Sequence, residues 1–351
     1  MPTNPLASDL DHILDHTRDL WDELRGERIF VTGGTGFFGC WLLESFIWAN
    51  ERLDLKANAV VLTRSPDAFQ AKAAHLAAHP GVTLLTGDVL SFRFPPGAFS
   101  HLIHAATESS AKLNAENPLL MLDTILEGTR HALDFAKACG AKKFLLASSG
   151  AVYGKQPPEV THIPEDYPGA PDPLDPRSAY GEGKRMAEHL CALYARQSAI
   201  EMKIARGFAF VGPDLPLNIH YAIGNFIRDG LYGGPIVVQG DGNPHRSYLY
   251  AADLAIWLWT ILLRGQSCRP YNVGSEESLS IAETGQWVAR AFSPPLRVDI
   301  RGMAHPDQAV ERYVPSITRA QSELGLHAWI SLEDGIAATI QFQRGSTKHG
   351  R

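Results

Sequence analysis

The chain has 351 residues, 45% of them hydrophobic and 20% charged, so it is long enough to bury a sizeable core. The formal net charge is −6 and no block of like charge occurs, which argues against nucleic-acid and membrane-surface partners. Four cysteines without paired spacing predict neither a disulfide framework nor a zinc site, and with no signal-peptide pattern and no bilayer-length apolar run we expect a cytoplasmic protein.

The first predicted element is a leading amphipathic helix over residues 8–25. Leu10, Ile13 and Leu14 recur at helical spacing, with acidic residues between the apolar positions. Basic residues are nearly absent from this segment, so we expect its apolar face to pack on the protein rather than on a membrane.

A strand, a glycine turn and a helix follow in the order typical of dinucleotide-binding folds. The segment 28–32 is short and β-prone, residues 33–39 carry Gly33, Gly36 and Gly39, and a helical run covers 40–49. Glycines there permit a tight turn and let backbone N–H groups approach a pyrophosphate at a helix N-terminus. A purely structural turn is the alternative. The missing Gly-Lys-Ser/Thr sequence excludes a P-loop NTPase.

Further strands alternate with helices along the first two hundred residues. This alternation predicts an α/β fold with a Rossmann-type doubly wound parallel sheet and a smaller C-terminal mixed substrate lobe. The predicted strands are 59–63, 82–85, 101–105, 143–147 and 202–205, and the predicted helices are 67–78, 118–139 and 180–198.

The character of the sequence changes after about residue 153. Residues 154–176 are rich in proline and predict an ordered loop or lid, and shorter elements with glycine turns follow Pro213. We expect three parts: a leading helix at 1–26, a dinucleotide-binding Rossmann domain at 27–206 to which 245–263 returns, and a mainly substrate-binding lobe at 207–345.

The residue at the end of the second strand bears on the cofactor. An acidic side chain there would bind the adenosine ribose 2′-hydroxyl, whereas this sequence has Arg64. An arginine suits a 2′-phosphate, so the sequence favours NADP(H) over NAD(H). The alternative is a solvated loop arginine.

Tyr180 and Lys184 are spaced so that both side chains lie on one face of a helix. A phenol titrates near pH 10 in water, so a tyrosine base needs cationic neighbours at neutral pH. Lys184 supplies one positive charge, and an oxidised nicotinamide ring would supply another. Ser149, at the end of the 143–147 strand, can orient a substrate oxygen. A Tyr-x-x-x-Lys spacing is common by chance, but its order after a glycine turn and a strand-end serine pair is far rarer.

Together these motifs resemble the extended short-chain dehydrogenase/reductase family, and within it the NAD(P)-dependent nucleotide-sugar epimerase/dehydratase branch. The likeness spans roughly residues 27–340. It rests on the glycine turn, Ser148–Gly154, Tyr180 with Lys184, Arg206–Pro213, and the segments 240–248, 250–255, 271–274 and 318–325.

The resemblance implies roles for individual residues. Tyr180 would be the general acid or base, Lys184 its partner and a cofactor ribose ligand, and Ser149 the positioning hydroxyl. The cofactor-binding set would be Gly33, Thr35, Gly36, Phe37, Phe38, Gly39, Arg64, Asp88, Val89, Ala105, Ala106, Thr107, Tyr180 and Lys184. The substrate-binding set would be Thr107, Ser149, Asn225, Arg246 and Arg312. The helices 118–139 and 180–198 resemble those that the family pairs in a homodimer.

Two departures from the family pattern narrow the chemistry. Sugar 4,6-dehydratases carry an Asp-Glu pair where this sequence has Gly150-Ala151, so dehydration and the related decarboxylation are disfavoured. Ala209 replaces an asparagine that usually contacts the substrate diphosphate. Glu108 is placed to act as an additional acid or base, or else is a solvated or helix-capping glutamate.

The leading hypothesis is therefore an NAD(P)-dependent enzyme that oxidises or reduces a hydroxyl or keto carbon of a nucleotide-linked sugar. Within this class, a nucleotide-sugar 4-epimerase is the activity that the sequence favours. The alternative is an NADPH-dependent 4-keto-sugar reductase or dehydrogenase, which Arg64 favours. A 4,6-dehydratase and a non-catalytic NADP-binding relative are less well supported. We expect a nucleotide-sugar substrate, a homodimer, no metal, and neither a nucleic-acid nor a membrane partner.

Overall fold

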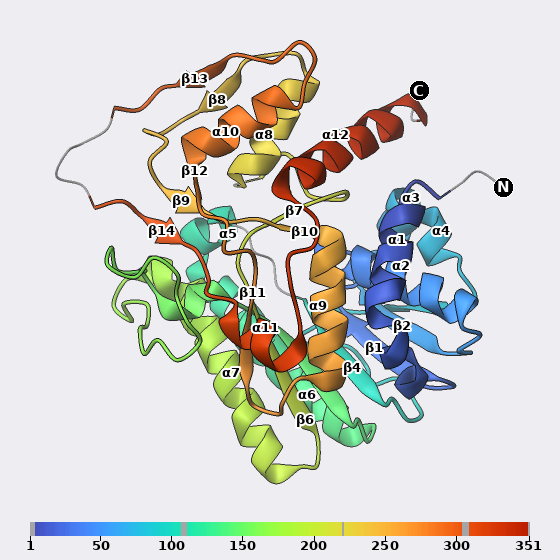
Figure 1. Cartoon of the computed structure of the whole chain (residues 1–351). Coiled ribbons are helices and arrows are strands. Elements are labelled where there is room, and N and C mark those ends of the chain that lie inside the picture. Colours follow the sequence, from blue (N-terminus) through green and yellow to red (C-terminus); the bar gives the residue numbers. More distant parts are fainter. Residues whose placement is uncertain (1–3, 107–110, 220, 304–308, 350–351) are drawn as a thin grey trace. The chain divides into compact units, whose positions relative to one another are not determined.

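The computed structural model describes residues 4–106, 111–219, 221–303 and 309–349 (Figure 1). By their internal contacts the residues group into two compact units. Unit 1 comprises residues 1–152, 170–207 and 255–271, and unit 2 comprises 153–169, 208–254 and 272–351. The contacts thus group 153–169 with the later part of the chain and return 255–271 to the earlier part.

A seven-stranded sheet organises unit 1. Its strand order is β11-β6-β5-β4-β1-β2-β3. The pairings from β3 to β6 are all parallel, which confirms the predicted doubly wound sheet. The strands are β1 (Arg28–Thr32), β2 (Asn58–Thr63), β3 (Val82–Thr86), β4 (His101–His104), β5 (Lys143–Ser149), β6 (Glu201–Gly207) and β11 (Pro270–Val273).

Apolar side chains on the central strands build the core on one face of this sheet. Phe30 of β1 and Phe144 of β5 are fully buried in a cluster that includes Ile125 and Leu133 of α6 (Pro118–Ala138). The helix α7 (Ala179–Gln197) packs against α6 and contributes Leu190. Successive side chains of a strand point to opposite faces of the sheet, so the residues next to Phe30 and Phe144 face the helices on the other side.

The predicted leading helix packs in that other layer and consists of two pieces. They are α1 (Ala7–Thr17) and the 3-10 helix η1 (Arg18–Leu24). Trp21 is fully buried, and its ring lies 4.8 Å from that of Trp259 in α9 (Ala251–Arg264). Trp259 Nε1 donates in turn to Ser45 Oγ of α2 (Phe37–Arg52) at 2.9 Å. The leading segment is therefore part of the core of unit 1.

The region between β2 and α6 departs from the predicted helix at 67–78. It forms two short helices, α3 (Pro66–Lys72) and α4 (Ala74–Ala77). The backbone of Ala73 leaves the helical region between them, with φ −145° and ψ 63°, so the predicted single helix was wrong. Further on, α5 (Ala111–Glu116) precedes α6, and Asn117 caps α6 by accepting from Leu120 N–H.

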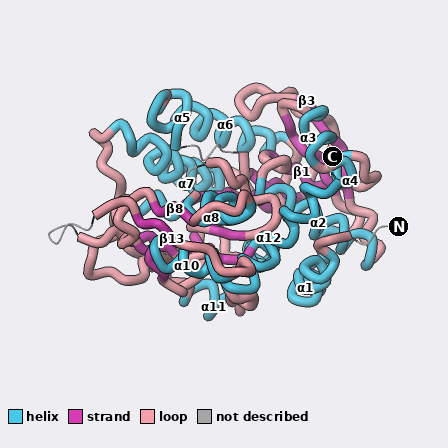
Figure 2. The backbone as a smooth tube through the Cα atoms, turned by 90° about the horizontal axis from the view of Figure 1, so that it is seen from above, coloured by secondary structure: helices cyan, strands magenta, loops and turns pink. Residues whose placement is uncertain are grey.

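Unit 2 is built from short strands and helices, as expected for a mixed lobe. Figure 2 shows β8 and β13, which pair in parallel, beside α8 and α10. The elements are β7 (Phe210–Val211), α8 (Ala222–Leu231), β8 (Ile236–Val238), β9 (His245–Arg246), β10 (Leu249–Tyr250), β12 (Leu279–Ser280), α10 (Ile281–Arg290), β13 (Val298–Ile300), β14 (Arg312–Tyr313), α11 (Thr318–Leu324) and α12 (Leu332–His349).

Buried polar contacts explain why residues 153–169 group with unit 2. Tyr153 Oη donates to Asn272 Oδ1 at 2.7 Å, and Asn272 Nδ2 donates to the Ile163 carbonyl at 2.9 Å. The backbone N–H of Asn272 donates to Glu165 Oε1 at 2.9 Å. Asn272 is fully buried, and losing any one partner would leave a buried polar group unsatisfied.

Candidate active site

The glycine turn between β1 and α2 lies directly against the backbone that follows β4. Gly33 has φ +72°, and a Cβ there would come within 2.4 Å of the Ala105 carbonyl. A Cβ on Gly39 would lie 2.3 Å from the Gly33 carbonyl oxygen. Gly36 is different, since its nearest atom would be 3.4 Å away. Steric contact thus requires glycine at two of the three predicted positions.

The end of α2 at this turn fits the pyrophosphate of a dinucleotide. Gly36 is the N-cap residue, and among the described residues no side chain caps the helix there. Phe37 and Phe38 form its first turn. A helix N-terminus of this kind presents backbone N–H groups and a favourable dipole to an anion. The residues present therefore suit the predicted cofactor, and a capping side chain would have competed with it.

The segment after β2 adds a lysine that sequence reasoning missed. Arg64 is exposed, and the next residue, Ser65, caps α3 by accepting from Ala68 N–H. Lys72, the last residue of α3, donates from Nζ to the Thr35 carbonyl in the glycine turn at 3.0 Å. The sequence showed only that a lysine ends the helix after β2. Its contact with the glycine turn depends on the folded structure.

The remaining predicted cofactor residues lie at the ends of β3 and β4. Asp88 follows β3 and accepts from Leu90 N–H at 2.9 Å. Val89 packs toward α6, where a Cβ on Gly128 would meet its side chain at 3.1 Å. Ala105 N–H donates to the Thr32 carbonyl, and Ala106 N–H donates to Thr32 Oγ1. Thr107 and Glu108 lie outside the described residues.

Ser149 is the last residue of β5 and is only 6% exposed. Its Oγ accepts from the Ala151 N–H at 3.2 Å. The chain then turns into the 3-10 helix η2 (Gly150–Tyr153). The serine hydroxyl is thereby fixed where a parallel strand ends, the edge of the sheet at which ligands bind in this class of fold.

Helix α7 brings Tyr180 and Lys184 to the same strand end. Lys184 is buried, and its Nζ donates to the Ala147 carbonyl of β5 at 2.7 Å. The ammonium nitrogen lies 5.8 Å from the centroid of the Tyr180 ring. Gly181 permits this approach, because a Cβ there would lie 2.8 Å from the Ala151 carbonyl oxygen. The structure thus gathers Ser149, Tyr180 and Lys184 around the end of β5.

Burial shapes the charges at this site. It lowers the pKa of Lys184 to about 8, partly offset by the negative charge of Glu188. The neighbouring His104 of β4 is fully buried between Thr32 Oγ1 at 2.8 Å and Thr129 Oγ1 at 3.1 Å. Burial and the Lys184 charge lower the pKa of His104 to about 3, so the imidazole is neutral at pH 7.

The three predicted substrate residues of unit 2 lie on different elements. Arg246 on β9 and Arg312 on β14 occupy neighbouring strands, because Tyr313 pairs with Arg246. Arg246 Nη2 donates to Glu311 Oε1 at 2.5 Å. Asn225 lies on α8, where its Oδ1 accepts from Arg228 Nη1 at 3.0 Å. The two arginines therefore lie on adjacent strands of one small sheet, where Arg246 is opposite Tyr313 and Arg312 is opposite His245, so that their side chains project from opposite faces.

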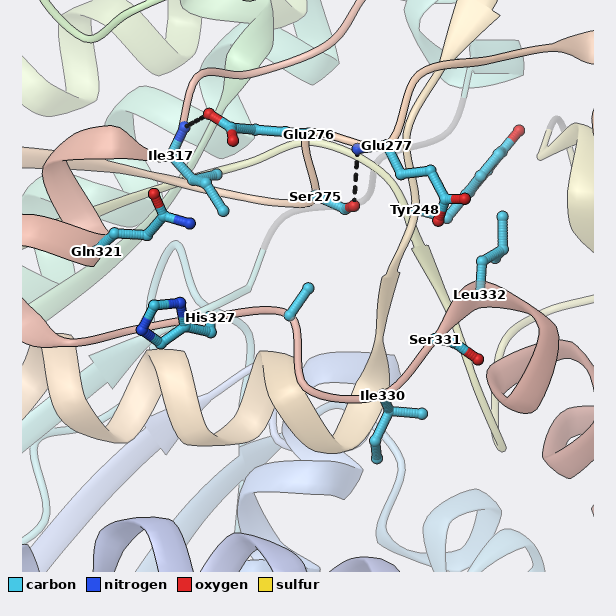
Figure 3. Close-up of a pocket in the computed structure, with 11 residues that line it drawn as sticks. Tyr248, Ser275, Glu276, Glu277, Ile317, Gln321, His327, Ile330, Ser331 and Leu332 are labelled. Carbon is cyan, nitrogen blue, oxygen red and sulfur yellow. Dashed lines mark hydrogen bonds between the residues drawn. The ribbon is translucent and has the colours of Figure 1, made fainter.

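A separate cavity of about 300 Å³ lies in unit 2 (Figure 3). The Glu276 carboxylate accepts there from Ile317 N–H at 3.0 Å, and Ser275 Oγ accepts from Glu277 N–H at 3.1 Å. His327 and Gln321 also line it. None of the residues predicted for the cofactor or substrate lines this cavity, and the Glu276 carboxylate is bound to a backbone N–H.

Within the residues that the structure describes, no helix combines the length and apolarity that crossing a membrane needs. The same residues contain no group of three or more His, Cys, Asp or Glu side chains placed to hold a metal ion.

Comparisons with known proteins agree with this arrangement. The model of the NAD dependent epimerase/dehydratase family matches residues 29–274. UDP-glucuronic acid decarboxylase 1 of Xenopus tropicalis is 30% identical over 323 residues, covering 92% of this chain and 73% of the relative. UDP-glucuronic acid decarboxylase 5 of Arabidopsis thaliana is 31% identical over 309 residues, covering 88% and 87%.

Solved structures share the fold at lower identity. A UDP-glucose 4-epimerase from Thermotoga maritima with UDP-glucose matches with a TM-score of 0.76 at 20% identity, covering 91% of this chain and 99% of that one. A Thermus thermophilus UDP-glucose 4-epimerase with NAD matches with a TM-score of 0.73 at 24% identity, covering 91% and 99%. The chain therefore belongs to the NAD dependent epimerase/dehydratase family and is an enzyme of the extended short-chain dehydrogenase/reductase type.

Proposed function

We propose that the protein oxidises and then re-reduces a hydroxyl carbon of a nucleotide-linked sugar, most simply as a nucleotide-sugar 4-epimerase. The observation that carries this proposal is the grouping of Ser149, Tyr180 and Lys184 around the end of β5, with Gly150 and Ala151 in place of further proton-transfer groups. Hydride exchange with a nicotinamide needs the serine, the tyrosine and the lysine. Elimination of water needs an additional acid and base, which Gly150 and Ala151 do not supply.

Each side chain has a defined task in this proposal. The nicotinamide supplies hydride acceptance and return when it is bound. Ser149 Oγ holds the sugar oxygen, and Tyr180 Oη takes the hydroxyl proton as the carbon–hydrogen bond breaks. The Lys184 ammonium favours the phenolate by its positive charge. Presenting the other face of the resulting ketone and returning proton and hydride yields the epimer, with no net redox change.

A second candidate is decarboxylation of a nucleotide-linked uronic acid. The relatives named UDP-glucuronic acid decarboxylase, at 30% and 31% identity, are the observation that favours it. A 4-keto uronic acid is a β-keto acid, so the pair of electrons of the breaking carbon–carbon bond can move toward the ketone as CO₂ leaves. Gly150 and Ala151 offer no side chain to protonate the carbanion that remains, and for this reason we rank epimerisation first.

The cofactor preference in this proposal is NADP(H). Arg64 follows β2 where an acidic residue would select NAD, and Lys72 places a second cation beside Thr35 of the glycine turn. Two cations near the adenosine ribose suit a 2′-phosphate. A cofactor consumed in stoichiometric amounts would make the protein the alternative 4-keto-sugar reductase.

The proposed assembly is a homodimer through α6 and α7. Large apolar side chains are exposed on both helices, namely Leu119 at 72% and Leu120 at 44% on α6, and Met186 at 48% and Leu193 at 41% on α7. Covering these side chains with the same helices of a second copy would remove them from water.

The experiment is incubation of the purified protein with UDP-glucose, UDP-glucuronic acid and related nucleotide sugars, with NAD⁺ or NADP⁺, followed by NMR. A 4-epimer with no net change of cofactor supports the first proposal, and a UDP-pentose with released CO₂ supports the second. Tyr180→Phe should reduce turnover by about 10³-fold, whereas Tyr194→Phe on the same helix, which loses only its 2.6 Å bond to Asp134, should not. Undiminished turnover in Tyr180→Phe would overturn both proposals.

A further inference from the structure

Glu188 lies one helical turn beyond Lys184 on α7, and its carboxylate is nearly buried. Its side chain is 12% exposed and that of its partner Arg206 is 13% exposed. Arg206 donates to it from Nε at 2.9 Å and from Nη2 at 2.6 Å. Ser148 Oγ donates to the same carboxylate at 2.5 Å. Such a two-point arginine contact holds both geometry and charge.

This carboxylate connects three elements next to the proposed active site. Ser148 and Arg206 are direct partners in the β5–β6 register, and Glu188 joins both of them from α7. Ser148 immediately precedes Ser149. The hydrogen-bonded group of Glu188, Ser148 and Arg206 therefore fixes both the strand end that carries the Ser149 hydroxyl and the packing of α7 against that strand end.

The groups around the Lys184 ammonium identify Glu188 as its source of negative charge. On α7 these groups are Tyr180, Glu188 and Cys191, and His104 faces the ammonium from β4. Arg206 of β6 is paired with Glu188. The pKa of Cys191 is raised by burial and that of His104 is lowered, so both side chains are neutral at pH 7. Glu188 is the carboxylate that offsets the burial of Lys184.

We propose that Glu188 is a positioning residue of this site, which holds the end of β5 through Ser148 and Arg206 and keeps Lys184 protonated beside Tyr180. The inference rests on the roles proposed above for Tyr180 and Lys184. A change of about one unit in the pKa of Lys184 would alter its protonated fraction at pH 7 substantially. With a pKa of about 8, roughly nine-tenths of Lys184 carries a proton at pH 7, and a decrease of about one unit would leave half.

The test measures the lysine directly, so it does not depend on knowing the substrate. The protein is labelled with ¹³Cε-lysine, and the Lys184 signal is assigned by its absence in Lys184→Arg. In Glu188→Gln we expect the midpoint of the Lys184 titration to move to lower pH by about one unit, because the attraction of an opposite charge is lost. The matched control is Glu27→Gln, which removes an ion-paired carboxylate 2.9 Å from Lys142, just before β5. That pair lies about 20 Å from Ser149 along the strand, so the control should leave the midpoint unchanged.

A purely structural Glu188 would behave differently. If Glu188 had only a structural role, the Glu188→Gln substitution would lower the melting temperature and leave the midpoint of the Lys184 titration unchanged. This result would overturn the proposal. Should that variant fail to fold because Arg206 keeps a nearly buried unpaired charge, Glu188→Gln/Arg206→Met removes both charges together. A downward shift is expected there too, but a smaller one, because the positive charge of Arg206 that opposes protonation of Lys184 is also lost. Inactivity of the wild-type protein on every nucleotide sugar would contradict the proposed function but not this titration.

Discussion

Unit 1 holds the residues around the end of β5 by close backbone contacts, whereas unit 2 carries its two predicted arginines, Arg246 and Arg312, on strands of two residues. Gly33 and Gly181 allow main chain to approach main chain, and Lys184 is anchored on the Ala147 carbonyl. In unit 2, Arg246 is held by Glu311, whose side chain is 54% exposed. Contacts of the first kind leave little room for substitution, while an exposed ion pair contributes little stability. We therefore expect substitutions in unit 1, the unit proposed to bind the cofactor, to cost more stability than substitutions at the arginines of unit 2 that are proposed to bind the substrate.

The largest expected effect tests whether the buried groups of unit 1 govern acid stability. The pKa of His104 is about 3 in the folded protein and 6.5 in the unfolded chain, so between these values the unfolded state binds the extra proton. This contribution to stability is fully present above pH 6.5 and falls as the pH falls, by an amount on the order of 3–4 kcal/mol at pH 4. Urea denaturation at pH 7 and pH 4 measures this decline.

The matched variant for that measurement is His104→Gln. It should be less stable at pH 7, where it loses the two threonine contacts in their native form, but its decline toward pH 4 should be smaller. The residual decline has a contribution from His101, whose pKa is also lowered by burial. An equally steep decline in the variant would contradict the prediction.

Replacement of Gly33 by alanine is expected to destabilise unit 1 by about 3 kcal/mol. The new Cβ would clash with the Ala105 backbone at 2.4 Å, and φ is +72°. The control is Gly36→Ala, where the nearest atom is 3.4 Å away and φ is −83°. Thermal melts of the two variants should differ clearly. Equal melting temperatures would mean that the glycine turn can shift to accommodate a Cβ. This result would contradict the statement that close backbone contacts in unit 1 restrict substitution.

In unit 2 the expected effect lies in substrate affinity rather than stability. Arg246→Ala should raise the KM for the nucleotide sugar by about 10- to 100-fold, with little change in the melting temperature, because a charge-assisted bond to a phosphate is lost. Glu311→Gln should lower the KM a few-fold by releasing Arg246 from its pair. Arg297→Ala, which breaks an exposed pair with Asp299, is the control that should alter neither value.

The smallest expected effect concerns cofactor choice. Arg64→Ala and Lys72→Ala should each weaken NADP⁺ binding by about 5- to 10-fold and leave NAD⁺ binding nearly unchanged, since exposed charge pairs contribute about 1 kcal/mol. Calorimetric titration of both cofactors measures the ratio. Arg52→Ala, an exposed arginine on α2 that stacks on Trp48, controls for the loss of a positive charge. An unchanged NADP⁺ affinity in both variants would remove the basis for the preference.

Much of unit 1 was predictable because its signals are local. Apolar strands alternating with amphipathic helices specify a parallel sheet, and the glycine spacing specifies the turn at the start of α2. The spacing of Tyr180 and Lys184 places both on one helical face, and the structure finds them 5.8 Å apart as ring centroid and ammonium nitrogen. Periodicity of this kind is a property of neighbouring residues, so it can be read before the chain folds.

Contacts between distant segments were not predictable in the same way. Nothing in the local pattern links Lys72 to Thr35, Gly181 to Ala151, or Glu188 to Ser148 and Arg206. The grouping of residues 153–169 with unit 2 likewise depends on Asn272, more than a hundred positions away from Ile163 and Glu165. Hydrophobic periodicity sets which face of an element is buried, but the partner of a buried polar group is chosen only when the elements pack, because its hydrogen bonds must then be satisfied inside the protein.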